Sequence, residues 1–68
     1  MITFEIETPY IELIKLLKVT RVADSGAAAK ALVEAGMVTR GGLPESRKRA
    51  KITKGERVEA RGITIQVV

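Results

Sequence analysis

The chain opens with a regular alternation of hydrophobic and polar residues. The hydrophobic positions are Ile2, Phe4 and Ile6. Because successive side chains of a strand point to opposite faces, this pattern predicts a half-buried strand over residues 2–7, at the edge of a sheet.

A helical spacing follows the first proline. Thr8 and Pro9 are typical of an N-cap and of the first helical position, where the missing N–H of proline costs nothing. The hydrophobic residues that would form one face of this helix are Tyr10, Leu13, Ile14 and Leu17. We therefore expect a helix that ends at about Lys18.

A second, alanine-rich helix is predicted before Gly36, the expected C-terminal glycine. Asp24 and Ser25 are its two candidate N-caps. Its inward face is expected to consist of Ala28, Leu32 and Ala35. These small side chains would allow close packing against the first helix.

Beyond this glycine the hydrophobic period returns to two residues. The expected elements are a strand at 37–40, a hairpin turn at Gly41 and Gly42, a returning segment at 43–45, a turn at 54–56 and a closing hairpin of 57–61 and 63–67 around Gly62. The order predicts one α+β domain over residues 1–68, with two short packed helices on a small, mostly antiparallel sheet.

Positive charge is concentrated in the second half of the chain. The net charge is +4, and eight of the 12 Lys and Arg residues follow Thr39, against three of the eight acidic ones. Residues 47–54 include no acid and five basic side chains: Arg47, Lys48, Arg49, Lys51 and Lys54. With Arg40 and Arg57 on either side, this run indicates a polyanionic partner, nucleic acid before an anionic membrane surface. Such residues contact phosphates without reading sequence. A solvated charged loop is the alternative interpretation.

The start of the second helix is another candidate phosphate site. The free N–H groups of Ser25 and Gly26 lie at the positive end of the helix dipole, and Lys30 follows one turn later. We expect the basic run to lie beside such a helix start. A capped helix without a ligand is the alternative, and Asp24 opposes an anion unless its carboxylate is used in capping.

The residue types that are absent from the sequence further restrict the functions that we expect. There is no Cys or His, so disulfides, thiolate metal sites and a histidine base are absent, and we expect no catalysis, cofactor, metal or small-molecule substrate. The absence of disulfides, of a roughly 18-residue apolar run and of a basic leader predicts a cytoplasmic protein with no membrane partner. Phe4 and Tyr10 are the only aromatic residues and both are expected in the core, so stacking on single-stranded bases is disfavoured and folded RNA is favoured.

Two stretches resemble a known family. Residues 10–42, with the helix start at 24–30 and a glycine turn after Gly36-Met37-Val38, resemble the alpha-L RNA-binding motif named after ribosomal protein S-four. Residues 44–52 are similar to a free-standing bacterial subgroup, the YbcJ-like proteins. The resemblance implies an α+β fold that holds structured RNA, such as rRNA or tRNA, along the helix pair and an adjoining loop, with ribosome association. The implied contact residues are Ser25, Gly26, Lys30, Arg40, Arg47, Lys48, Arg49 and Lys51.

This chain departs from the family pattern at two places. Many relatives have arginine where Gly26 stands, and the usual Asn-Gly turn is Gly41-Gly42. Two other interpretations stay open. The two helices could form a DNA-binding helix-turn-helix, although the second helix offers few polar side chains for base edges. The terminal strands could instead pair with a partner protein in an interaction or ribosome-docking module.

Overall fold

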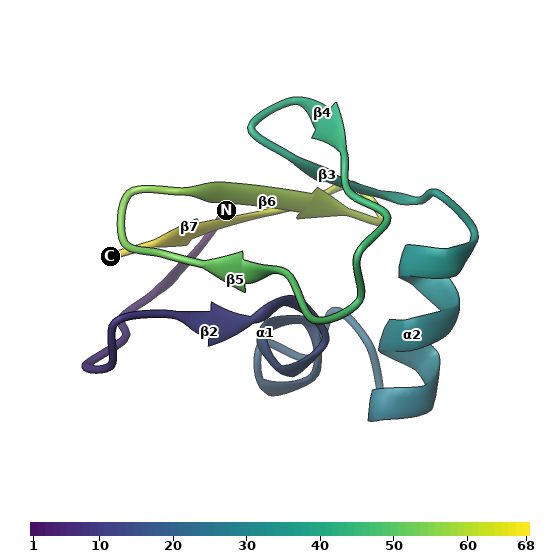
Figure 1. Ribbon diagram of the computed structural model, residues 1–68, viewed down its shortest axis with the longest axis horizontal. Coiled ribbons are helices and arrows are strands. Elements are labelled where there is room, and N and C mark those ends of the chain that lie inside the picture. Colours follow the sequence, from purple (N-terminus) through teal and green to yellow (C-terminus); the bar gives the residue numbers. More distant parts are fainter.

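The computed structural model describes residues 1–68 and contains seven strands and two helices (Figure 1). In chain order these are β1 (Ile2–Phe4), β2 (Ile11–Glu12), α1 (Leu13–Val19), α2 (Gly26–Glu34), β3 (Val38–Arg40), β4 (Leu43–Pro44), β5 (Lys51–Ile52), β6 (Arg57–Ala60) and β7 (Ile63–Val67). Neither helix has the length and apolar character needed to cross a membrane. The predicted α+β class is confirmed, with two helices that pack against each other and against the sheet.

The strands form one large sheet and one small ribbon. The large sheet has the order β1-β7-β6-β3-β4, in which β1 is parallel to β7 and the other pairs are antiparallel. The ribbon consists of β2 and β5, paired antiparallel. Figure 1 shows that α1 continues directly from β2, while α2 stands at one end of the molecule. Because β1 ends the order of the large sheet, the first strand is at a sheet edge, as predicted, but it ends at Phe4 and does not continue to Glu7.

Two tight turns set the register of the large sheet. Gly41 and Gly42 have φ of 59° and 86°, and the β6–β7 turn has φ of 54° at Arg61 and 75° at Gly62. Positive φ at both central positions is the geometry of the hairpin turn whose twist matches that of the flanking strands. Both predicted hairpins are confirmed. Arg61 adopts the left-handed region without being glycine, which is strained for a side chain of this size.

The core contains 16 buried hydrophobic residues, drawn from both helices, the sheet and the ribbon. The alternation predicted for the last two strands is observed, because Val58 and Ala60 of β6 and Ile65 and Val67 of β7 are buried while Arg57 and Glu59 are exposed. Leu13, Leu16 and Leu17 make α1 the most deeply buried helix.

The prediction of a helix from Pro9 is wrong. Residues 11–12 form β2, and α1 begins only at Leu13. The hydroxyl of Thr8 donates to the carbonyl of Tyr10 over 2.8 Å and caps no helix. The ladder with β5 competes with helix formation here, because it extends residues 11–12. Tyr10 is 39% exposed, so its assignment to the core is also wrong.

The second helix has the predicted ends but a rotated face. The Ser25 hydroxyl accepts a hydrogen bond from the N–H of Ala28 over 3.1 Å, and Gly36 closes the helix with φ of 73°. The buried residues are Ala29 and Val33, each one position after an expected one. The residues expected to face inward are at the margin or outside: Ala28 and Leu32 are half-buried and Ala35 is exposed.

Candidate nucleic-acid interface

The first part of the basic run, residues 47–50, lies in the connection between β4 and β5 and is fixed to the start of α1. The N–H of Leu13 donates to the carbonyl of Ala50 over 2.9 Å, and the N–H of Ile14 donates to the carbonyl of Lys48 over 3.2 Å. No side chain caps this helix, whose N-cap residue is Glu12. Because the first turn of a helix leaves N–H groups without intrahelical partners, the loop carbonyls take the place of a cap. The loop is therefore part of the packed structure.

Glu45 organises the beginning of this loop. Its carboxylate is buried and accepts from the N–H of Arg47 over 3.0 Å and from Nε of Arg47 over 3.2 Å. Nη1 of Arg40 lies 3.3 Å from the same group. The side-chain and backbone hydrogen bonds from Arg47 lower the pKa of Glu45 to about 2, because they stabilise the ionised form. The carboxylate thus stays charged at neutral pH.

Arg40 joins three segments around that carboxylate. Its Nε and Nη2 form a two-point contact with Glu56 at 2.7 and 2.9 Å, and Nη2 also donates to the carbonyl of Lys51 over 2.9 Å. Such paired contacts are stronger and more directional than single ones. They raise the pKa of Arg40 and lower the pKa of Glu56. The guanidinium of Arg40 is thus committed to contacts within the protein, although it still contributes positive charge at the surface.

Four cationic side chains line one surface hollow, together with Ala50: Arg40, Arg47, Arg49 and Lys51. We call this the basic hollow. Arg47, Arg49 and Lys51 follow one another at a spacing of two residues, and all three line this hollow. Lys48 instead pairs with Glu34 of α2 over 3.1 Å. The side chains of Arg47 and Arg49 are 73% and 78% exposed, so both are accessible to a ligand.

The other candidate residues lie outside the basic hollow. Ser25 and Gly26 are at the start of α2, whereas Lys48 contacts Glu34 at its end. At about 1.5 Å of rise per residue, these ends are about 13 Å apart along the axis. The loop thus adjoins the start of α1, and the expectation that it lies beside the start of α2 is wrong.

Lys30 and Lys54 lie on different sides of the basic hollow. Lys30 precedes Glu34 by one helical turn and therefore shares its face of α2, toward Lys48. Lys54 lies in the turn between β5 and β6, at the opposite end of β5 from the basic loop (Figure 1). A ligand that contacts all of these residues must extend across the molecule.

The sequence did not reveal which carboxylates pair with the basic side chains. Besides Glu45 and Glu56, Glu12 accepts from Nε of Arg49 over 3.0 Å. Only the pairing of Glu45 with Arg47 is local, two residues apart, so its spacing was the one available signal. Tyr10 was also misplaced, because its ring lies at the surface with Nζ of Lys51 5.0 Å from the ring centre.

These features define a small α+β domain in which two helices and a mixed sheet present a basic loop. The family model described as "S4 domain" matches residues 4–68, and the chain belongs to the S4 domain family. The protein YbcJ of Escherichia coli (strain K12) is 42% identical over 69 residues, covering all of this chain and 99% of YbcJ. The protein of the same name from Shigella flexneri gives the same values.

The solution structure of YbcJ from E. coli has the same fold as this chain. The two superpose with a TM-score of 0.77 at 42% identity, over the whole of this chain and 87% of the other. That structure is described as revealing an alpha-L motif involved in RNA-binding. The resemblance to the alpha-L motif and to the YbcJ-like subgroup is confirmed.

Proposed function

We propose that this protein is a non-catalytic, cytoplasmic RNA-binding protein that holds the phosphates of structured RNA at the basic hollow. One observation carries the proposal: Arg40, Arg47, Arg49 and Lys51 come from two separate parts of the chain and surround a single depression. The description of YbcJ's motif as involved in RNA-binding supports the same function.

Arg47 and Arg49 are the strongest candidates for direct phosphate contact. Each has an exposed guanidinium whose planar donors can hold a phosphate at two points. Their ion pairs with Glu45 and Glu12 orient them, and most of each side chain stays exposed. A phosphate can therefore share the guanidinium donors without displacing these carboxylates. Arg40 and Glu45 act behind them, as residues that position the loop.

The form of the RNA follows from the scarcity of aromatic side chains. Phe4 is half-buried and the ring of Tyr10 is next to Lys51, so no pair of free rings is present for stacking successive bases. Recognition of a folded backbone is favoured, and rRNA and tRNA are the abundant RNAs of this kind. The remaining candidates would extend the contact along α2 and the β5–β6 turn: Ser25, Gly26, Lys30, Lys48 and Lys54.

The test measures the affinity for a folded tRNA transcript and for an unstructured RNA of equal length. We expect the folded RNA to bind more tightly, with affinity falling at least about tenfold between about 50 and 200 mM salt if several phosphates are neutralised. The triple variant Arg47→Ala/Arg49→Ala/Lys51→Ala should lose at least about tenfold in affinity and flatten the salt dependence by about two to three contacts.

A matched triple variant outside the basic hollow, Lys15→Ala/Lys18→Ala/Arg21→Ala, removes the same charge from exposed positions. It should retain most of the affinity. Equal losses in both triple variants would show that net charge alone attracts the RNA. Equal affinity for duplex DNA would instead favour the helix-turn-helix interpretation, and partners that survive ribonuclease treatment of a lysate pull-down would favour protein-mediated docking.

A further inference from the structure

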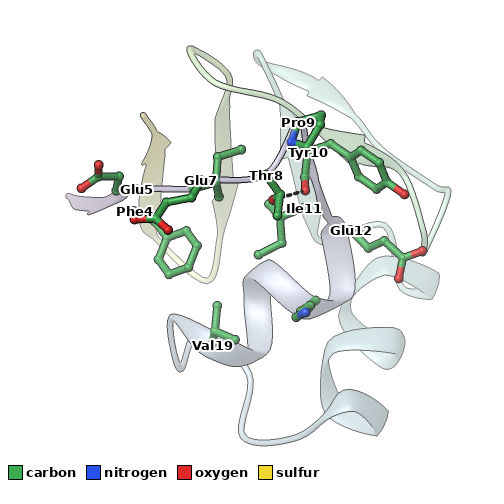
Figure 2. A pocket seen from close by; sticks show the side chains of 11 residues that line it. Phe4, Glu5, Glu7, Thr8, Pro9, Tyr10, Ile11, Glu12 and Val19 are labelled. Carbon is green, nitrogen blue, oxygen red and sulfur yellow. Dashed lines mark hydrogen bonds between the residues drawn. The ribbon is translucent and has the colours of Figure 1, made fainter.

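A second hollow follows the segment that joins β1 to α1. It has a volume of about 790 Å³ and is lined by residues 4–12 together with Lys15 and Val19 of α1 (Figure 2). We call it the acidic groove. Sites that enclose small ligands or anchoring side chains span roughly 300–1,000 Å³. This groove is therefore large enough to take several side chains of a partner.

The wall of the acidic groove is apolar and uncovered. Val19, at the end of α1, is 45% exposed, and Phe4 is half-buried. Figure 2 shows the ring of Phe4 extending from its strand toward the side of α1 that carries Val19. Ile6 and Ile11 are buried behind this surface. Covering Phe4 and Val19 would remove apolar area from water, which favours association.

The charges of the groove have the opposite sign to those of the basic hollow. Three carboxylates and one ammonium group line it: Glu5, Glu7, Glu12 and Lys15. Glu12 pairs with Arg49, whereas Glu5 and Glu7 form no salt bridge and no side-chain hydrogen bond. Two free carboxylates beside an apolar wall repel RNA and attract a segment that carries both basic and apolar residues.

The backbone beside the groove has one paired side and one free side. The N–H of Ile6 donates to the carbonyl of Val68, and the N–H of Val68 donates to the carbonyl of Phe4, both over 2.9 Å. The N–H and C=O groups of Glu5 and Glu7 make no hydrogen bond within the protein. The two hydrogen bonds with Val68 continue the β1–β7 pairing past Phe4, so the free side of β1 extends to Glu5 as an open edge that another extended chain can join, and the chain bends at Glu7.

We propose that the acidic groove binds an extended, basic segment of a partner protein. The segment adds to the free edge of β1 as far as Glu5, places alternate apolar side chains against Phe4 and Val19, and sets Lys or Arg beside the carboxylates of Glu5 and Glu7. This combines main-chain hydrogen bonds for affinity with alternate side chains for selectivity. The inference is independent of RNA binding, because it uses none of the residues of the basic hollow.

The probe is a synthetic peptide of about six residues, a usual strand length, that alternates Lys and Val and has blocked ends. Its control alternates Glu and Val. Each is titrated into the full ¹⁵N-labelled chain, and the backbone amide signals are followed by NMR. We expect the Lys peptide to shift the signals of residues 4–8 and of Val19, and the Glu peptide to shift none.

Two charge reversals separate the groove from general electrostatics. Glu7→Lys lies in the groove, while Glu59→Lys makes the same change at an exposed position of β6 outside it. Glu7→Lys should weaken peptide binding roughly fivefold, because an attraction becomes a repulsion, and Glu59→Lys should leave it within about twofold. Val19→Ser, which removes exposed apolar surface, should also weaken it roughly threefold.

Three results would overturn the proposal. One is the absence of any shift, or shifts confined to other surfaces. Another is an equal effect of the Glu7 and Glu59 reversals, which would mean that the peptide responds to net charge. The third is a concentration-dependent shift of both the groove and residues 47–51 in the free chain, which would identify a second copy of this protein as the occupant.

Discussion

The basic hollow and the acidic groove are neighbours, yet they are built in opposite ways. They meet at the β2–β5 ribbon, where Glu12 is paired with Lys51 in the register and the ring of Tyr10 lies near the ammonium of Lys51. In the hollow, Arg40, Arg47 and Arg49 each pair with a carboxylate. In the groove, Glu5 and Glu7 have no partner.

This difference separates charges that maintain the fold from charges that are free for a ligand. Glu45 is buried and accepts hydrogen bonds from Arg40 and Arg47, so removing its charge weakens the charge-assisted hydrogen bonds that hold the start of the loop. Glu7 is exposed and has no salt-bridge partner, so it contributes little to folding. The charges of the two regions therefore have different energetic roles.

The largest effect is expected for Glu45→Gln, which is compared with the same isosteric substitution at Glu7. Glu45→Gln should lower the free energy of unfolding by about 2 kcal/mol, because Arg40 and Arg47 lose a buried charged partner. Glu7→Gln should change it by less than about 0.5 kcal/mol. Urea unfolding of both variants, followed by circular dichroism, measures the two values. Similar losses in both would erase the distinction between the two regions.

Acid should reduce the difference in the free energy of unfolding between the wild type and Glu45→Gln. The pKa of Glu45 in the folded protein, about 2, lies below its ordinary value of 4.5, so its contribution to stability is complete above about pH 5 and is lost as the pH falls toward 2. Between about pH 6 and about pH 3, the wild type should lose about 1–2 kcal/mol more than Glu45→Gln. Parallel urea titrations of the two proteins, at several pH values, test this. Parallel pH profiles would show that other carboxylates cause the acid sensitivity.

The smallest effect is expected at the start of α2. It tests whether this helix end contacts the bound RNA together with the basic hollow. A Cβ added at Gly26 meets no atom within 4 Å and the residue has no positive φ, so Gly26→Arg is sterically accommodated. It should tighten binding of the folded RNA by about threefold to tenfold and add about one contact to the salt dependence. Thr3→Arg adds the same charge on the exposed face of β1. Equal gains from both would place the start of α2 outside the interface.

Local chemistry made much of the fold predictable. The Gly41-Gly42 and Arg61-Gly62 turns follow from residues that tolerate positive φ, and the cap at Ser25 follows from a hydroxyl before an alanine-rich stretch. The start of α1 was missed because it depends on pairing with β5, some 40 residues later in the chain. The hydrophobic pattern of a short stretch of sequence carries no information on a strand partner so far along the chain.

The candidate site, like the fold, was predictable only in part. Its basic residues stand in one run and were found there, but the direction of each side chain depends on distant carboxylates. Glu12 and Arg49 are 37 residues apart, and Glu34 and Lys48 are 14 apart. Which cations share the hollow, and which one turns toward α2, is therefore a property of the tertiary structure.

The two hydrogen bonds from the start of α1 to carbonyls of the β4–β5 loop reduce the entropy that is lost when a ligand binds. Any movement of residues 48–50 away from the body would strip Leu13 and Ile14 of their acceptors at a helix end that has no other cap. The loop is thereby held in one backbone conformation before a polyanion arrives, and little ordering entropy is lost on association. Slow deuterium uptake at the amides of Leu13 and Ile14 would report that rigidity directly in the free protein.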